Sequence, residues 1–275
     1  MNISDAKDLP IGVFDSGVGG LTVLKALRVE LPHEDFIYLG DTARLPYGTK
    51  SPASIVRYAC QATRALQRSG IKLLVVACNT ASAVALDALR EQMSPLPVLG
   101  VVQPGAAAAV GARPGGTHLV LATETTVRLG AYRKAIAEID PEARVTELAC
   151  ELLVALAEEG WHDGTIAGAI VRRYLAGLDE KPGKADSVIL GCTHFPLLRG
   201  AIADVFDSDV SIVDSTGTTA IAARELLASL SLGNTRAAAG SLMLQATDSA
   251  ARFARVGGRF LGEELVAEDI SLVDL

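Results

Sequence analysis

The sequence predicts an α/β protein with mainly parallel sheets, and three observations support this class. Apolar residues make up 49% of the 275 residues and aromatic residues only 4%, so small aliphatic side chains are expected to fill the core. Short apolar runs recur, each followed by polar or glycine-rich residues and then by a stretch with helical periodicity. The length leaves room for two domains of ordinary size.

The short apolar runs are the expected strands, and the amphipathic stretches between them are the expected helices. The strands are predicted at residues 11–14, 36–39, 73–77, 98–102, 119–122, 145–148, 188–191 and 211–213. The helices are predicted at residues 51–67, 81–92, 127–138, 165–178 and 218–229.

Loop composition indicates where a second domain begins. Residues 111–116 read Gly-Ala-Arg-Pro-Gly-Gly, which is typical of a surface connection, and the strand-loop-helix cycle restarts directly afterwards. Residues 181–184, Lys-Pro-Gly-Lys, are also predicted to form a loop. From about Asp214 the chain either continues the second domain or returns to the first, and periodicity leaves both open.

Charge and motif spacing exclude several classes of protein. With 25 basic and 32 acidic residues the formal charge is -7, and no Lys/Arg run is long enough to follow a phosphate backbone, so nucleic acid is not an expected partner. The start of the chain lacks the pattern of a secretory leader, and no apolar segment approaches the ~20 residues that span a bilayer. We therefore expect a cytoplasmic protein that does not bind membranes.

The cysteines and histidines show no metal-binding spacing. The four cysteines are far apart and form no Cys-x-x-Cys pair, so neither a disulfide framework nor a zinc site is indicated. No two of the four histidines lie at the spacing of helical metal ligands. We expect free thiols and no bound metal.

Two cysteines stand where a buried strand ends and a helix is about to begin. Cys78 follows the run 73–77, and Cys192 follows the run 188–191. In open α/β sheets, ligands bind beyond the carboxyl ends of the strands, and a helix N-terminus lowers the pKa of a thiol there. A single cysteine is more often an inert core residue, but two in equivalent positions favour a functional pair. Cys60 and Cys150, in apolar helical context, are interpreted as core residues.

The glycine-rich turn at residues 15–20 follows the first predicted strand. A dinucleotide fingerprint does not fit, because its third glycine would fall at Thr22 and Asp15 would repel a pyrophosphate. Such a turn also lets the backbone approach a small ligand while Asp15 projects into the site. Asp41 in its loop and Glu158 on its helix are, taken alone, ordinary surface carboxylates.

Four blocks of the chain, in this order, resemble the motifs of glutamate racemases in the aspartate/glutamate racemase superfamily. They comprise residues 12–22 (GVFDSGVGGLT), 40–48 (GDTARLPYG), 77–82 (ACNTAS) and 191–198 (GCTHFPLL). The resemblance runs along nearly the whole chain. It implies two flavodoxin-like three-layer αβα domains that face a central cleft, one of residues 1–102 plus 214–275 and one of residues 103–213.

The resemblance also implies the roles of individual residues. Cys78 and Cys192 would be the two acid/base thiols, with Asp15 supporting Cys78 and His194 supporting Cys192. Asp41 and Glu158 match further acidic positions around the site. The residues implied to hold the substrate are Asp15, Ser16, Tyr47, Gly48, Asn79, Thr80, Thr123, Thr193 and His194.

The chain departs from the family pattern in the second domain. Cys150–Glu151 stands where glutamate racemases commonly have Cys-Pro, and Ala122, Thr125 and Leu129 replace residues of a Gly-Thr-x-Gly-Thr loop and a nearby serine. These changes lie outside the thiol motifs, at the wall implied to meet the distal carboxylate of the substrate.

The expected reaction is the cofactor-independent interconversion of L- and D-glutamate, supplying D-glutamate for peptidoglycan, by a homodimer. Two bases on opposite faces exchange the α-proton, and Asn79, Thr80 and Thr193 are suited to meet the charge on the substrate carboxylate. No lysine lies in the motifs, which argues against a pyridoxal Schiff base. The alternatives are a racemase of aspartate or another acid, a non-catalytic small-ligand binding protein and, more weakly, a regulatory protein.

Overall fold

The chain forms two separate parallel sheets in the computed structural model, which describes residues 6–176, 178 and 185–275. All eight registered strand pairs are parallel. The first sheet has the order β10-β9-β2-β1-β3-β4, with β1 Ile11–Asp15, β2 Phe36–Gly40, β3 Leu73–Val76, β4 Val98–Gly100, β9 Leu242–Ala246 and β10 Ile270–Leu272. The second has the order β6-β5-β7-β8, with β5 Thr117–Ala122, β6 Arg144–Ala149, β7 Ser187–Gly191 and β8 Ser211–Asp214.

The two sheets repeat one arrangement. In β2-β1-β3-β4 and in β6-β5-β7-β8, the earliest strand along the chain lies between the second and the third. Because Cys78 follows β3 and Cys192 follows β7, the two cysteines occupy equivalent positions in this repeat. Ligand-facing loops lie beyond the carboxyl ends of such strands.

Helices cover both faces of each sheet, as successive strand residues point to opposite faces. On the first sheet Val13 packs in a cluster with residues of α2 and α12, whereas Phe14 packs with residues of α3 and α4. On the second, Leu121 packs with residues of α8 to α10 and Ala122 with those of α5 and α7. The helices are α2 Leu21–Glu30, α3 Pro52–Arg68, α4 Asn79–Met93, α5 Val102–Ala112, α6 Glu124–Arg128, α7 Ala131–Ile139, α8 Glu151–Glu159, α9 Gly164–Leu175, α10 Arg199–Ala203, α11 Ser215–Ser229 and α12 Ala250–Leu261.

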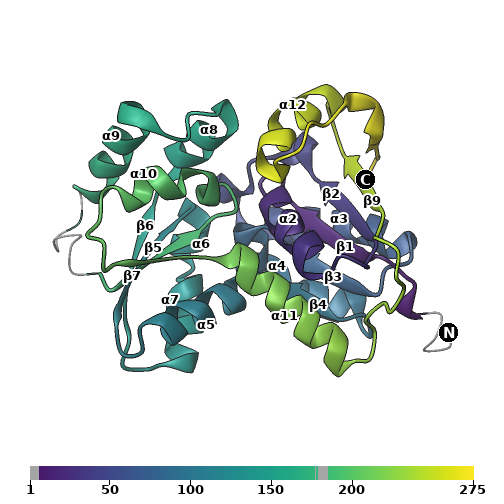
Figure 1. Cartoon of the computed structure of the whole chain (residues 1–275), viewed down its shortest axis with the longest axis horizontal. Coiled ribbons are helices and arrows are strands. Elements are labelled where there is room, and N and C mark those ends of the chain that lie inside the picture. Colours follow the sequence, from purple (N-terminus) through teal and green to yellow (C-terminus); the bar gives the residue numbers. More distant parts are fainter. Residues whose placement is uncertain (1–5, 177, 179–184) are drawn as a thin grey trace.

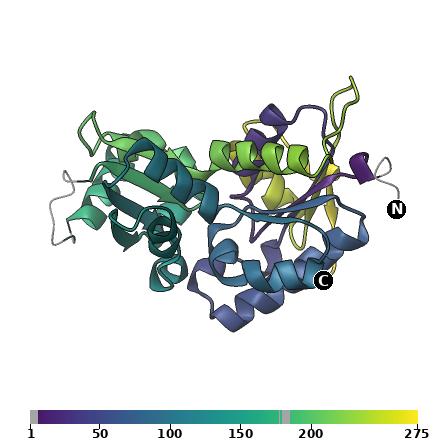
Figure 2. The same ribbon diagram turned by 90° about the horizontal axis from the view of Figure 1, so that it is seen from below.

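The two sheets and their helices form two halves that meet along one boundary (Figures 1 and 2). The half built on the first sheet contains β1 to β4 together with the later strands β9 and β10, so the end of the chain returns to where it started. One cluster of buried residues continues from β1 and α2 across the boundary to Cys192 and Phe195. The domain boundaries at 102/103 and 213/214 stay a prediction.

The predicted α/β class and parallel sheets are confirmed, and all eight predicted strands lie within two residues of the observed ends. The single helix predicted at residues 127–138 is wrong, because the chain forms α6 and α7 with Gly130 between them at φ +60, a conformation that interrupts a helix. Strands β9 and β10 were not predicted; β10 has only three residues, too few for a pattern. The loop predicted at residues 181–184 lies outside the described residues.

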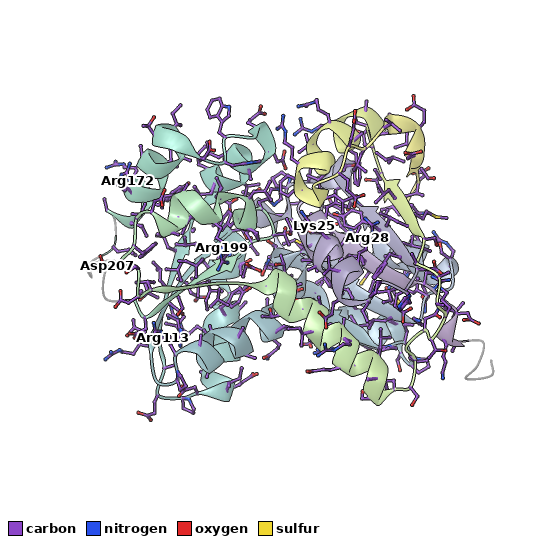
Figure 3. All side chains as sticks on the ribbon, viewed as in Figure 1. Lys25, Arg28, Arg113, Arg172, Arg199 and Asp207 are labelled. Atoms are coloured by element: carbon purple, nitrogen blue, oxygen red, sulfur yellow. The ribbon has the colours of Figure 1, made fainter. Side chains whose placement is uncertain are left out.

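Charged side chains are distributed over both halves. Figure 3 labels Lys25 and Arg28 on the first-sheet half and Arg113 and Arg172 on the other. Arg28 pairs with Glu263 at 2.8 Å, so some of this charge is locally balanced. Among the described residues, no helix has both the length and the apolar character needed to cross a bilayer.

Candidate active site

Strand register gathers three of the predicted site residues at one edge of the first sheet. Asp15 at the end of β1 is registered with Gly40, so Asp41 follows at the same level, and the amide of Ala77 donates to the carbonyl of Phe14 at 2.8 Å, so Cys78 lies just beyond β3. Parallel strands bring their carboxyl ends to the same edge. The motifs that contain Asp15, Asp41 and Cys78 therefore meet in space.

The second sheet gathers an equivalent set. Ala122 is registered with both Ala149 and Gly191, which places Thr123, Cys150 and Cys192 together beyond the strand ends. Cys150 is buried, in agreement with its interpretation as a core residue, but it lies at the N-cap of α8, directly after β6, and not within a helix. Burial raises the pKa of its thiol to about 12. Its position shows that a strand end alone does not identify a functional thiol.

The thiol of Cys78 caps the helix that follows it. Its sulfur accepts a hydrogen bond from the amide of Ala81 and lies near the hydroxyl of Ser16, with both distances 3.4 Å. The cap is therefore the cysteine itself and not one of the polar residues after it. Burial and, after it, the negative charge of Asp15 raise the pKa of this thiol to about 12. Cys78 is accordingly held as a thiol.

Asp15 is buried at the start of the glycine-rich turn. Its Oδ2 accepts the amide of Gly17 at 2.8 Å, while Oδ1 has no hydrogen-bond partner among the described residues. Burial raises the pKa of this carboxyl, and the nearby His194 partly opposes the effect. The hydroxyl of Tyr38 donates to the carbonyl of Gly17 at 2.9 Å and holds the turn in place.

Cys192 is the first of three residues that are linked by polar contacts. Its Sγ lies 3.7 Å from Nδ1 of His194, and Nε2 of His194 lies 3.3 Å from Oε1 of Glu158. Burial lowers the pKa of His194, but its bonds to Cys192 and Glu158 outweigh burial and raise that pKa to about 10. The bond from His194 in turn lowers the pKa of Glu158. A protonated imidazole thus lies between a sulfur and a carboxylate.

Two arginines of α12 reach across the boundary to the same glutamate. Arg252 donates to Oε2 of Glu158 at 2.8 Å, and Arg259 donates to the main-chain carbonyl of Glu158 at 2.8 Å. Glu158 belongs to α8, which packs on the second sheet, but the two arginines that bind it belong to the half built on the first sheet. Sequence reasoning did not identify either arginine, since both are exposed residues on an amphipathic helix far along the chain from any motif.

The glycine-rich turn packs directly on the Cys192 loop. The hydroxyl of Thr22 donates to the carbonyl of Thr193 at 3.1 Å. A Cβ on Gly19 would lie 2.5 Å from Nδ1 of His194, which is too close for real atoms. Only glycine at residue 19 allows this approach between the two halves.

Replacing Gly19 with alanine is expected to reduce turnover roughly 10- to 100-fold while the protein remains folded, because an added methyl group displaces His194 from Cys192. Initial rates and thermal unfolding of the variant measure the two effects. Gly17→Ala is the matched control in the same turn, since its Cβ would meet nothing closer than Leu45 at 3.5 Å. Equal rates for the two variants would contradict the close approach.

Hydroxyl and amide groups also meet at the boundary, beside Cys78. The hydroxyl of Thr80 lies 2.8 Å from that of Thr123, which lies 3.0 Å from that of Thr126. Asn79 accepts a hydrogen bond through Oδ1 from the hydroxyl of Tyr132 at 2.6 Å. Thr126 and Tyr132 were not predicted, because no local pattern distinguishes them from other buried polar residues of helices.

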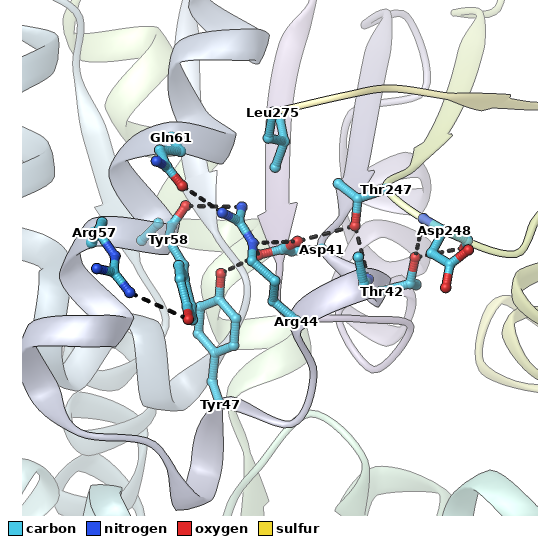
Figure 4. A network of polar contacts seen from close by, with 12 residues as sticks. Asp41, Thr42, Arg44, Tyr47, Arg57, Tyr58, Gln61, Thr247, Asp248 and Leu275 are labelled. Carbon is cyan, nitrogen blue, oxygen red and sulfur yellow. Dashed lines mark hydrogen bonds and ion pairs between the residues drawn. The ribbon is translucent and has the colours of Figure 1, made fainter.

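Asp41 organises the loop that carries Tyr47 and Gly48 (Figure 4). Its carboxylate accepts hydrogen bonds from Arg44 Nε at 2.7 Å, from Thr247 at 3.0 Å and from the hydroxyl of Tyr47. Asp41 is fully buried, and the hydrogen bonds of its carboxylate among the described residues go to this loop and to Thr247 and not to a thiol. This geometry suits an acidic residue that positions Tyr47 rather than one that contacts a substrate.

Gly48 meets the part of the second half where the chain departs from the family pattern. A Cβ on Gly48 would lie 2.9 Å from that of Thr123 and 3.2 Å from Oε1 of Glu151. The same Oε1 accepts the amide of Glu124 at the start of α6. The departure at Glu151 thus lies beside two predicted substrate-binding positions.

The arrangement supplies two thiols, each with its own polar environment, and neutral donors between them. Each thiol is 6% exposed. Within the residues that the structure describes, no three His, Cys, Asp or Glu side chains are grouped so as to hold a metal ion. Proton transfer at carbon is chemistry that such a pair of thiols can perform.

Comparison with known proteins finds one family repeatedly. Residues 21–223 match the model of the Asp/Glu/Hydantoin racemase family. The glutamate racemase of Geobacter metallireducens is 49% identical over 255 residues, which cover 93% of this chain and 93% of that relative.

Solved structures agree with this match. The glutamate racemase of Francisella tularensis, solved in complex with D-glutamate, superimposes with a TM-score of 0.89 at 36% identity, covering 98% of both chains. An aspartate racemase of Picrophilus torridus superimposes with a TM-score of 0.57 at 16% identity, covering 81% of this chain and 94% of that chain, a likeness of fold alone.

Proposed function

The chain belongs to the Asp/Glu/Hydantoin racemase family, and we propose that it interconverts L-glutamate and D-glutamate without a cofactor. The observation that carries the proposal is the pair of thiols at equivalent strand ends of two facing halves, with Ser16 beside Cys78 and His194 beside Cys192. The glutamate racemase of Geobacter metallireducens, 49% identical over 93% of this chain, supports glutamate over aspartate.

The two thiols exchange the α-proton of the substrate. One cysteine, as thiolate, removes the proton from one face, and the other, as thiol, returns a proton to the opposite face, so the two sulfurs end with their protonation states exchanged. In the starting state Cys78 is the thiol, because burial raises its pKa to about 12. Beside the second thiol, the protonated imidazole of His194 lies 3.7 Å from the sulfur of Cys192.

The carbanion between the two transfers is stabilised through the substrate carboxylate. Negative charge develops there, so hydrogen-bond donors placed in advance lower the barrier. Asn79, Thr80, Thr123 and Thr193 are buried at the boundary and supply amide and hydroxyl donors. Asp15 and Ser16, in the glycine-rich turn, lie beside Cys78 and contact the substrate there. Tyr47 and Gly48 contact the substrate from the loop that follows Asp41.

The biological role that we propose is supply of D-glutamate for peptidoglycan, in the cytoplasm. All four cysteines are free, which fits a reducing compartment. Family membership supports a homodimer, which analytical ultracentrifugation of the purified protein tests directly. A single species of 28.6 kDa would contradict it.

The reaction is tested in deuterated water. Purified protein, treated with a chelator and freed of pyridoxal, is incubated with L- or D-glutamate, and optical rotation and α-deuterium are followed together. Rotation is expected to fall to zero from either enantiomer, with deuterium at the α-carbon. Exchange of aspartate but not glutamate would show that the substrate is wrong, and no exchange of either would favour a binding protein.

A further inference from the structure

The side-chain amide nitrogen of Asn79 lies at the boundary between the two halves and has no hydrogen-bond partner among the described residues. It is the first residue of α4, directly after Cys78, and is 2% exposed. Its Oδ1 accepts the hydroxyl of Tyr132, whereas Nδ2 is the atom without a partner in the described part of the chain. A buried amide nitrogen without a partner is costly unless a ligand supplies an acceptor.

Tyr132 reaches Asn79 from the other half of the molecule. It belongs to α7, which packs on the second sheet, and its ring is fully buried. The ring lies against two glycines: a Cβ would be 3.3 Å from it at Gly105 and 3.0 Å from it at Gly191. The close packing leaves the phenol little room to move, so its hydroxyl is held 2.6 Å from Oδ1 of Asn79.

The hydroxyl decides which way the amide of Asn79 faces. Burial raises the pKa of Tyr132, so the phenol keeps its proton and acts as a donor. The hydroxyl donates to Oδ1 of Asn79, so Nδ2 of the same amide points away from Tyr132. With the amide turned over, Oδ1 would meet the substrate carboxylate and repel it.

We propose that Tyr132 is a positioning residue that fixes the amide of Asn79 so that Nδ2 donates to the α-carboxylate of the substrate. The proposal rests on the function proposed above. The bond from Tyr132 links the second half of the molecule to Asn79 of the first half. The amide of Asn79 therefore has the orientation that suits the substrate only when the two halves are in contact.

Replacement of Tyr132 with phenylalanine removes the hydroxyl and keeps the ring. The value of kcat/KM is expected to fall roughly tenfold, the worth of one hydrogen bond, and by the same factor from both enantiomers because their equilibrium constant is one. In an Asn79→Ala background the same replacement is expected to change kcat/KM less than twofold, because the group that Tyr132 positions is already gone.

A merely structural role would give a different result. Loss of packing or stability would reduce kcat/KM by the same factor with Asn79 or with alanine at that position, and that outcome, or full activity of Tyr132→Phe alone, would overturn the proposal. Tyr174→Phe is the matched control, since its hydroxyl accepts the amide of Leu152 at 2.9 Å and has no bond to Asn79 among the described residues. This control should keep kcat/KM within twofold.

A second readout needs no turnover. The Nδ2 resonance of Asn79, identified by its absence from the Asn79→Ala spectrum, is expected to shift when D-glutamate is added to the wild-type protein and to shift less in Tyr132→Phe. Equal shifts would overturn the proposal. A wild-type protein that binds D-glutamate but does not racemise it would reject the proposed function, and this comparison would still decide the role of Tyr132.

Discussion

Replacing either Cys78 or Cys192 with serine is expected to reduce racemisation by about 10² to 10⁴-fold in both directions, because each direction needs one sulfur as base and the other as acid. A serine hydroxyl at the same place is far too weak an acid or base. The double variant is expected to lose about as much as each single one, since removal of either thiol already interrupts the exchange.

Initial rates from both enantiomers, at equal concentrations of folded protein, measure this loss. Cys60→Ser is the matched control, because Cys60 lies within α3, is only partly buried and has no bond to the polar groups of the boundary among the described residues. Cys150→Ser is a second control, because Cys150 also follows a strand. It tests whether replacing any cysteine in that position reduces the rate. If either Cys78→Ser or Cys192→Ser kept a tenth of the wild-type rate, the two-thiol mechanism would be wrong.

Replacing His194 with asparagine is expected to reduce turnover roughly 100-fold or more, because the positive charge beside the sulfur of Cys192 is lost. The variant leaves Glu158 with Arg252 as its remaining charged partner at 2.8 Å. The rates of the two proteins across pH measure the effect. A variant with a wild-type rate at pH 7 would remove His194 from the mechanism.

The same residue links stability to pH. The pKa of His194 is raised in the folded state to about 10 from a usual value of 6.5, so the protonated imidazole stabilises the fold. This contribution is fully present below about pH 6.5 and is lost as the pH rises towards 10, with a size on the order of 3–5 kcal/mol. The difference in unfolding free energy between wild type and His194→Asn should shrink over that range.

Urea unfolding at pH 6, 8 and 9.5 tests this dependence. His162→Asn is the control, because His162 bonds only the carbonyl of Ala157 at the end of α8, at 3.0 Å, among the described residues. A constant difference between wild type and His194→Asn across the range would show that the imidazole is not held protonated by its neighbours.

Local sequence was sufficient for eight of the ten strands among the described residues and for the motifs that those eight carry. A buried parallel strand is a short apolar run bounded by polar residues, and this pattern depends only on neighbours in the chain. Asp15, Cys78 and Cys192 were found because each follows such a run. The resemblance to glutamate racemases added Glu158, which the pattern of its own helix predicts to be an ordinary surface carboxylate.

Position after a strand does not distinguish the two proposed acid/base cysteines from the third cysteine that follows a strand. Cys78, Cys150 and Cys192 all occupy that position, but only Cys192 has a protonated histidine beside it, and only Cys78 has Ser16. A pKa depends on burial and on charges within a few ångströms, which come from distant parts of the chain.

The tertiary structure alone placed Tyr132 on Asn79 and Arg252 on Glu158. These pairs are separated by 53 and 94 residues, and each joins the two halves across their boundary. Helical or strand periodicity reports which face of an element is buried, but it carries no information about which distant side chain that face will meet. Folding of the two sheets against each other decides those contacts, and with them the orientation of the donors that the reaction requires.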